Sequence, residues 1–94
     1  MAGDPRSVMV FSAPADPSRR EQLDALAFDG AAASRRDVIV VDVAERLDAL
    51  ALCDLYGVAP GSFAVVLIGR DGSEQARWLV PVETSELWDL IDEE

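Results

Sequence analysis

Three short apolar runs constrain the fold of this chain more than any other feature. Residues 7–12 read Ser-Val-Met-Val-Phe-Ser, residues 38–41 read Val-Ile-Val-Val, and residues 63–68 read Phe-Ala-Val-Val-Leu-Ile, all without a charged side chain. Runs of this length, rich in β-branched residues, are typical of strands covered on both faces. They are too short to span a membrane. These runs therefore belong in the centre of a sheet or under helices.

The segment after the first run predicts a helix. Residues 13–17 contain two prolines that break the strand, and Asp16 or Ser18 can cap the helix that follows. Ser18 also has capping-box spacing to Glu21. The apolar stripe of this helix is Leu23, Leu26 and Ala27. Asp29-Gly30 interrupts it, and whether the helix resumes over residues 31–34 stays open, because Ala favours a helix and Gly does not.

The second run lies in the predicted strand Asp37–Val43 and leads into a second predicted helix, Ala44–Tyr56. The expected apolar face of that helix comprises Leu47, Leu50, Ala51, Leu52 and Leu55. Gly57 follows it at the position where glycine commonly ends a helix.

The last part of the chain predicts a hairpin and a final helix. Asp71-Gly72 is a hairpin-turn signal after the third run, and Glu74–Val80 alternates polar and apolar residues as an edge strand does. Pro81 ends that strand. Thr84 or Ser85 can cap a helix, whose apolar stripe is Leu87, Leu90 and Ile91.

The element order is therefore β-α-β-α-β-β-α. The first two strands form a parallel pair joined by a right-handed crossover, and the last two form an antiparallel hairpin. Residues 1–94 thus predict one α/β domain with a four-stranded mixed sheet, strand order 2-1-3-4, and helices on both faces. This is the thioredoxin-like arrangement.

The sequence also resembles a known family. The segments that carry the resemblance are 36–41 (Arg-Asp-Val-Ile-Val-Val), 63–72 (Phe-Ala-Val-Val-Leu-Ile-Gly-Arg-Asp-Gly) and 87–92 (Leu-Trp-Asp-Leu-Ile-Asp), with Pro81-Val82 between the last two. They are similar to the prokaryotic branch of the DUDES group, thioredoxin-like domains of unknown function related to equarin. The resemblance implies a thioredoxin-like fold and no established activity. Members usually carry a secretion signal and a basic extension after the last helix, and this chain shows neither.

The junction between the first strand and the first helix lacks the thioredoxin redox motif. Redox members of that fold place Cys-x-x-Cys there, where the helix N-terminus lowers the pKa of the attacking thiol. Here residues 12–18 read Ser-Ala-Pro-Ala-Asp-Pro-Ser. Pro60 precedes the start of the third strand, Phe63, by three residues, whereas the fold's proline facing the redox site stands closer. Disulfide exchange by this route is therefore excluded.

Composition excludes several other chemistries. The chain has 18 Asp and Glu against 8 basic residues, all Arg, and its net charge is −10. The absence of His excludes a Ser-His-Asp triad and the usual zinc site, and we predict no metal and no cofactor. The acidic field repels phosphate backbones, so we expect no nucleic-acid partner.

Cys53 is the single candidate nucleophile. Neighbouring leucines and Asp54 predict a buried, inert thiol, because no cation stands near to activate it. The alternative is a divergent thiol-redox or peroxidase-like enzyme that acts through Cys53, and an exposed, acidic thiol would favour it.

The arginines form two pairs that the topology separates. Arg19 and Arg20 lie in the first turn of the first helix, where we expect them to pair with Asp16, Glu21 or Asp24 rather than to bind an anion. Arg35 and Arg36 precede the second strand and therefore lie at the opposite edge of the sheet. The two pairs cannot form one basic patch.

Two tryptophans are candidate contact residues. Trp78 falls on the edge strand and Trp88 on the last helix. If Trp88 lies opposite Leu87 and Ile91, it is exposed and forms a docking face together with the acids Asp89, Asp92, Glu93 and Glu94.

The leading hypothesis is a non-catalytic thioredoxin-like module that binds a protein partner through an acidic surface. A weaker alternative is a charge mimic that binds a basic protein. We expect no membrane association and a cytoplasmic location as the sequence stands, or export if a signal has been removed. Catalytic residues are not assigned, and the oligomeric state stays open.

Overall fold

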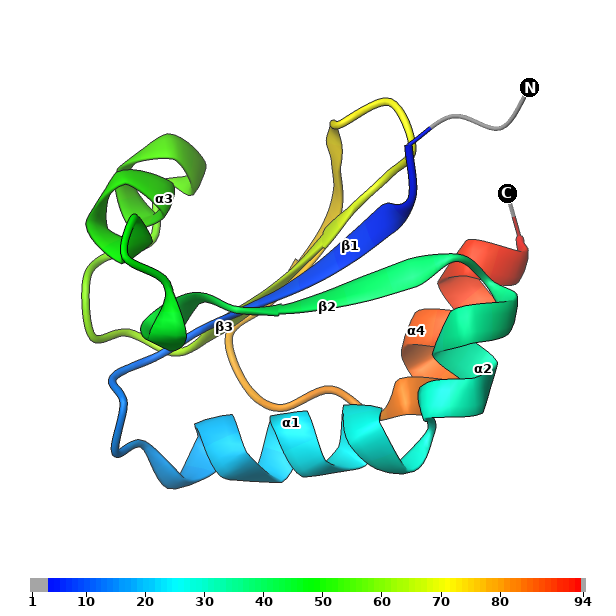
Figure 1. Ribbon diagram of the computed structural model, residues 1–94, viewed down its shortest axis with the longest axis horizontal. Helices are drawn as coiled ribbons and strands as arrows, with labels where there is room; N and C mark the ends of the chain where they lie inside the picture. The colour runs from blue at the N-terminus through cyan, green and yellow to red at the C-terminus, as the bar shows by residue number, and fades with distance from the viewer. Residues whose placement is uncertain (1–3, 94) are drawn as a thin grey trace.

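The computed structural model describes residues 4–93, and Met1–Gly3 and the last acid, Glu94, lie outside it. Its elements follow the predicted order (Figure 1). They are β1 (Arg6–Phe11), α1 (Pro17–Phe28), α2 (Gly30–Arg35), β2 (Val38–Asp42), a short 3-10 helix η1 (Val43–Glu45), α3 (Ala49–Tyr56), β3 (Ala64–Ile68), β4 (Glu74–Trp78) and α4 (Thr84–Asp92).

The four strands form one mixed sheet in the order β2-β1-β3-β4. β1 pairs in parallel with β2 and antiparallel with β3, and β4 is antiparallel to β3. In this register Met9 stands between Val41 of β2 and Val66 of β3. The predicted α/β class and strand order are confirmed.

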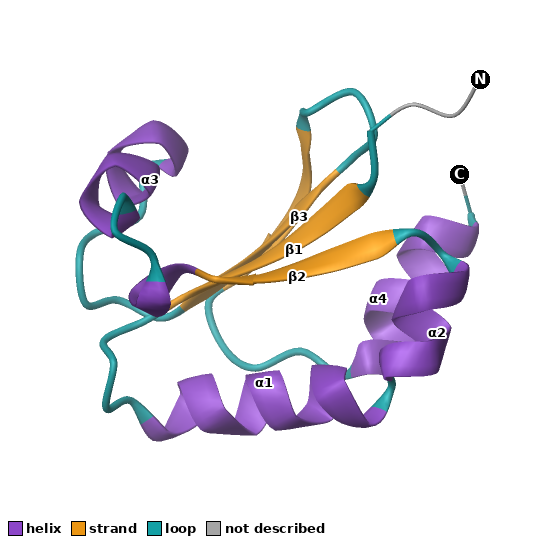
Figure 2. Cartoon of the chain, in the orientation of Figure 1, coloured by secondary structure: helices purple, strands orange, loops and turns teal. Residues whose placement is uncertain are grey.

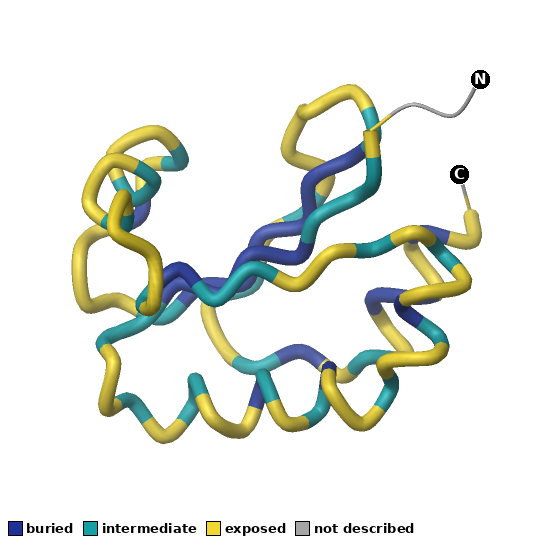
Figure 3. The backbone as a smooth tube through the Cα atoms, in the orientation of Figure 1, coloured by how far each residue is buried: buried dark blue, intermediate teal, exposed yellow. Residues whose placement is uncertain are grey.

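Helices cover both faces of the sheet, but unequally (Figure 2). Side chains of α1, α2 and α4, among them Leu26, Ala33 and Leu87, form one core cluster with one face of β1 and β3. On the other face the cluster receives Val43 from η1 and partly buried side chains from α3. Figure 3 shows the consequence: β1 and β3 are largely buried, whereas α3 is exposed or only partly buried along its length.

The first helix begins where its cap predicts. The Asp16 carboxylate accepts a hydrogen bond of 2.9 Å from the Ser18 amide, so Asp16 is the cap and Pro17 is the first helical residue. The alternative cap, Ser18 with Glu21, is not used. The helix resumes after Asp29 as the separate helix α2, which resolves the question left open by Gly30.

The predicted helix Ala44–Tyr56 is wrong in its first half. The chain forms η1, turns, and starts α3 only at Ala49. Leu47 is fully exposed, and Leu50 and Leu55 are each 71% exposed, so the expected broad apolar face is not buried. Periodicity indicates a stripe of leucines, but no second element lies over it.

The two edge strands also differ from expectation. β2 is an edge strand with Ile39 and Val40 partly exposed, although its β-branched run predicts cover on both faces. β4 ends at Trp78, two residues before the expected end, and leaves Leu79 and Val80 exposed. The last helix starts at Thr84 after Glu83, so neither Thr84 nor Ser85 acts as its cap.

A buried glutamine fastens α1 to the segment before α4. Gln22 is 1% exposed, and its side-chain amide donates to the Val82 carbonyl at 3.0 Å while its oxygen accepts from the Val82 amide at 2.7 Å. Both backbone groups of Val82 are thereby satisfied inside the core, where an unpaired polar group is costly.

We predict that Gln22→Leu lowers the free energy of unfolding by about 2–4 kcal/mol, because it leaves the N–H and C=O of Val82 buried without partners. Urea unfolding followed by circular dichroism measures the change. The matched control is Gln75→Leu on exposed β4, which should change stability by less than about 0.5 kcal/mol. Equal effects of the two substitutions would contradict this role for Gln22.

Candidate functional site

The candidate site lies where β1 and β2 end and the chain turns towards α1 and η1. A cavity of about 230 Å³ opens there, lined by Ser12, Pro14, Leu50, Cys53 and Pro60 among others. A second hollow of about 540 Å³ shares Leu50, Cys53 and Pro60 with it. We call these two hollows together the junction cavity. It brings together the strand–helix loop, α3 and the loop before β3.

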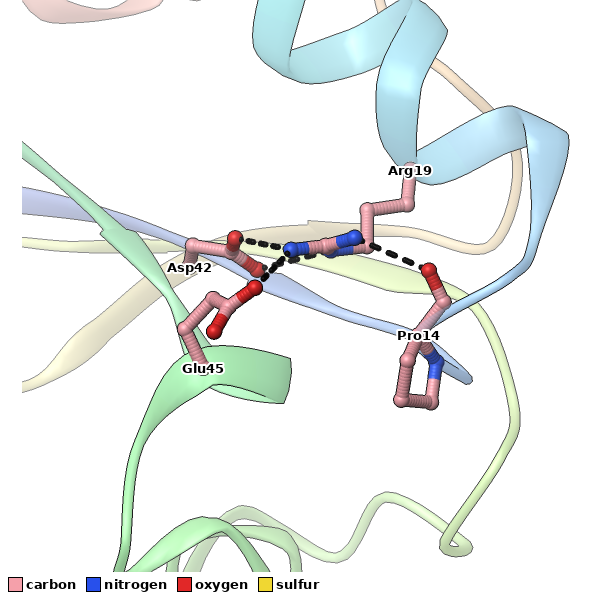
Figure 4. Close-up of polar contacts among 4 residues, drawn as sticks. All are labelled: Pro14, Arg19, Asp42 and Glu45. Atoms are coloured by element: carbon pink, nitrogen blue, oxygen red, sulfur yellow. Dashed lines mark hydrogen bonds and ion pairs between the residues drawn. The ribbon is translucent and has the colours of Figure 1, made fainter.

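Arg19 connects three segments of the chain beside the junction cavity (Figure 4). Its guanidinium donates to both Asp42 carboxylate oxygens, at 3.1 and 2.6 Å, and to Glu45 at 2.9 Å. It also donates to the Pro14 carbonyl at 2.8 Å, so α1, the loop after β1 and the end of β2 are held together. The hydrogen bonds that Arg19 donates to Asp42 are the largest cause of the raised pKa of Arg19.

This cluster corrects one expectation and supports another. Arg19 pairs with Asp42 and Glu45, which are distant in sequence, and not with Asp16, Glu21 or Asp24. Since its donors already meet two carboxylates and a carbonyl, Arg19 offers no anion site, as expected. The sequence contained a signal for the contact between Arg19 and Asp42. The carboxyl end of a parallel strand and the start of the crossover helix lie at the same edge of the sheet.

Cys53 lines the junction cavity from α3 and is half-buried. The expectation of a fully buried thiol is therefore wrong, because the neighbouring Leu50 and Leu55 face outward and give it no cover. The structure places Cys53 against Ser12 to Pro14, the junction at which redox members of the fold carry their thiols.

Ser12 is the functional candidate that sequence reasoning missed. Within residues 4–93, its hydroxyl is the buried side-chain polar atom that has no hydrogen-bond partner. It lies at the end of β1 and lines the same cavity as Cys53. A buried hydroxyl without a partner is costly, so a bound group that completes its hydrogen bonding is favoured.

Trp88 is buried, which contradicts its proposed place in an exposed docking face. Its indole N–H donates to the Asp29 carboxylate at 3.1 Å, and the Arg36 guanidinium stacks 5.3 Å from the ring centroid. Asp29 also accepts from the Thr84 hydroxyl at 2.6 Å. The hydrogen bond from Thr84, followed by that from Trp88, lowers the pKa of Asp29.

The remaining candidates lie away from the junction cavity. Trp78 is half-buried on β4 and donates to Glu86 at 2.7 Å. Arg36 pairs with Asp92 at 2.8 Å at the opposite end of β2 from Arg19, so the two arginine pairs are separate, as predicted. The hydrogen bond from Arg36 lowers the pKa of Asp92.

Residues 4–93 contain neither a metal-binding cluster nor a membrane-spanning helix. No group of three or more Asp, Glu or Cys in that range is arranged to hold a metal ion. None of its helices has the length and apolar character that crossing a membrane requires.

Comparison with known proteins identifies the fold and the family. Residues 1–94 match the family described as "Domain of unknown function (DUF4174)". Among curated proteins, none matches the sequence. Thioredoxin-2 of the malaria parasite, described as a component of its protein secretion machinery, is 18% identical, with a TM-score of 0.72 over 96% of this chain and 84% of that one.

Two further structures agree. Thioredoxin from Fasciola hepatica is 20% identical, with a TM-score of 0.67 over 98% of this chain and 84% of the other. The C-terminal domain of DsbD from Neisseria meningitidis, in its oxidised form, is 22% identical, with a TM-score of 0.66 over 96% and 80%. These similarities show that the fold is thioredoxin-like.

The hydrogen bond between Asp29 and Thr84 predicts how the stability of the protein depends on pH. Because the folded protein lowers the pKa of Asp29 below its unfolded value of about 3.9, this carboxylate stabilises the fold above that value. Its contribution is lost as the pH falls through the lowered pKa. Urea midpoints measured between pH 7 and pH 3 should therefore fall less steeply for Thr84→Ala than for the wild type.

Thr84→Ser keeps the hydroxyl and serves as the matched control. It should follow the wild-type curve within the error of the urea midpoints. If Thr84→Ala lost as much stability in acid as the wild type, the Asp29–Thr84 hydrogen bond would not be a source of the acid sensitivity.

Proposed function

Because this chain belongs to the DUF4174 family, whose description assigns no activity, we propose its function from the junction cavity: the domain binds a protein partner there without acting as an enzyme. The observation that carries the proposal is the composition of that cavity. Ser12, Ala13 and Pro14 stand where redox members carry thiols, and the rest of the lining is mainly apolar, with Cys53 supplying a thiol from α3.

The rim of the cavity supports contact with an apolar segment. Leu50 lines both hollows and is 71% exposed, while Leu47 and Leu55 on the same part of the chain are also exposed. Of these three leucines, Leu50 lines the cavity, so it is the one that an apolar side chain of a partner bound there would cover.

Charge supports a basic partner. The chain carries a net charge of −10, and exposed Asp54 lines the second hollow beside Leu50. A complementary positive segment is attracted to such a surface, chiefly through its rate of association. We therefore infer an extended partner segment in which apolar and basic residues alternate, with a polar group that satisfies the Ser12 hydroxyl.

We also propose a narrower family assignment for this chain. The segments 36–41, 63–72 and 87–92 support a place among the prokaryotic DUDES-type domains related to equarin. A cytoplasmic location, or export after removal of a signal, is likewise proposed.

We predict that a synthetic peptide alternating Leu and Arg shifts the amide resonances of Ser12, Ala13, Leu50 and Cys53. Leu50→Ser should weaken this binding about tenfold, because it removes an apolar contact worth about 1.4 kcal/mol. The matched control is Phe28→Ser, an equally polar change at a 92% exposed residue of α1, which should alter the Kd less than twofold.

Two peptides of the same length separate the alternatives. A Leu and Glu peptide that binds as tightly would contradict the inferred charge complementarity. A Ser and Arg peptide that binds as tightly would show that apolar contact is unimportant and would favour the charge mimic.

Thiol chemistry at Cys53 is the second candidate, favoured because Cys53 of α3 lines the same cavity as the strand–helix junction. We predict that Cys53→Ser leaves binding of the Leu and Arg peptide within twofold of the wild type, and that the wild type does not turn over hydrogen peroxide or a small disulfide. Turnover that is lost in Cys53→Ser would contradict the non-catalytic proposal and support the redox alternative.

A further inference from the structure

Among residues 4–93, no second strand pairs with the outer edge of β2. β2 stands at one end of the strand order, and Figure 1 shows it in front of the other strands with no element across it. The Arg6 amide donates to the Asp37 carbonyl at 3.0 Å, which fixes the phase of the parallel ladder. Alternate residues Val38, Val40 and Asp42 therefore direct their backbone N–H and C=O groups away from β1.

This edge lacks the features that usually prevent strand pairing. Proteins protect free edges with lysine, proline, bulges or a covering element. Here the edge reads Val-Ile-Val-Val, with Ile39 50% and Val40 36% exposed. The opposite edge strand, β4, carries Glu74 and Arg77 as an ion pair at 2.8 Å.

An apolar groove continues the β2 edge. It has a volume of about 480 Å³ and lies between β2 and the helices α1 and α2. Val38 and Val40 line it from the strand, and Leu23, Ala27 and Ala33 line it from the helices. A strand added beside β2 would place its own apolar side chains at the mouth of this groove.

The charges along β2 make the edge complementary to itself. Exposed Arg35 precedes the strand and adds a positive charge beside the Arg36–Asp92 and Arg70–Asp37 ion pairs. At the end of the strand Asp42 and Glu45 share the single cation Arg19, which leaves a net negative charge there. An antiparallel copy places the basic start of one strand against the acidic end of the other. With Val40 opposite Val40, Ile39 faces Val41, and both copies present the hydrogen-bonding groups of Val38, Val40 and Asp42.

We propose that two copies of this domain pair antiparallel through β2, about a two-fold axis at Val40, and join their sheets into one. The same patch then serves both copies, as a two-fold interface requires. The overall charge of −10 opposes association, but at physiological salt its repulsion is screened beyond about 8 Å. Because a five-residue strand pair is smaller than a standard interface, we expect a Kd of about 1–100 µM.

Sedimentation equilibrium from about 0.5 to 500 µM tests the proposal, since this range brackets the expected Kd. The wild type should dimerise, and Val40→Lys and Ile39→Lys should each raise the Kd at least about tenfold, with circular dichroism confirming that each variant folds. Leu55→Lys makes the same change on exposed α3 and should leave the Kd within about twofold. A wild type that is monomeric throughout, or a Leu55→Lys variant as weakened as Val40→Lys, would overturn the proposal.

Cross-linking tests the register in a Cys53→Ser background. With Val40 opposite Val40, the Cα atoms of the two copies are about 5.5 Å apart, within reach of a disulfide. Val40→Cys should therefore form a disulfide-linked dimer on mild oxidation at least about tenfold faster than Ile39→Cys. In this register the two copies of residue 39 are not directly opposite each other but lie diagonally across the strand pair, farther apart. Equal rates would overturn the two-fold axis at Val40.

Discussion

The burial of β3 on both faces is the constraint on which the rest of the structure depends. All five residues of β3 are buried, and neighbouring β1 is buried over its last four. A chain of 94 residues has limited surface with which to cover two faces of a sheet. It places α1, α2 and α4 on one face and leaves α3 with η1 to cover the other. The exposed leucines of α3 and the open edge of β2 are the consequences of this unequal division.

The well-covered face is fastened by polar contacts between segments distant in the chain. Gln22 binds the backbone of Val82, Asp29 accepts from Thr84 and Trp88, and Arg36 pairs with Asp92. Each contact joins the α1–α2 segment to α4 or the loop before it. The α3 face has mainly apolar contacts, and Arg19 holds its border at the end of β2. The structure is therefore more firmly fixed on the face away from the junction cavity.

The sequence predicted the helices and strands better than it predicted which of their side chains are buried. The apolar runs at 7–12, 38–41 and 63–68 became strands. The crossover and hairpin rules predicted two strand pairs, and the thioredoxin-like arrangement that they fit supplied the order 2-1-3-4. The leucines of residues 47–55 predicted a buried face that α3 does not have. The condition under which Trp88 would be exposed is not met, because Trp88 is buried. Periodicity shows that a helix has an apolar stripe, but it does not show which element lies over that stripe.

By itself, the sequence determined the strands, their connections and the absence of a thiol pair at the strand–helix junction, because these depend on local residue order. Only the tertiary structure decided that Gln22 meets Val82, 60 residues away, and that Arg19 meets Asp42, 23 residues away. It also decided that Cys53 shares a cavity with Ser12. Such contacts depend on how helices lie across the sheet, and that packing is set by the sum of many side chains rather than by any local motif.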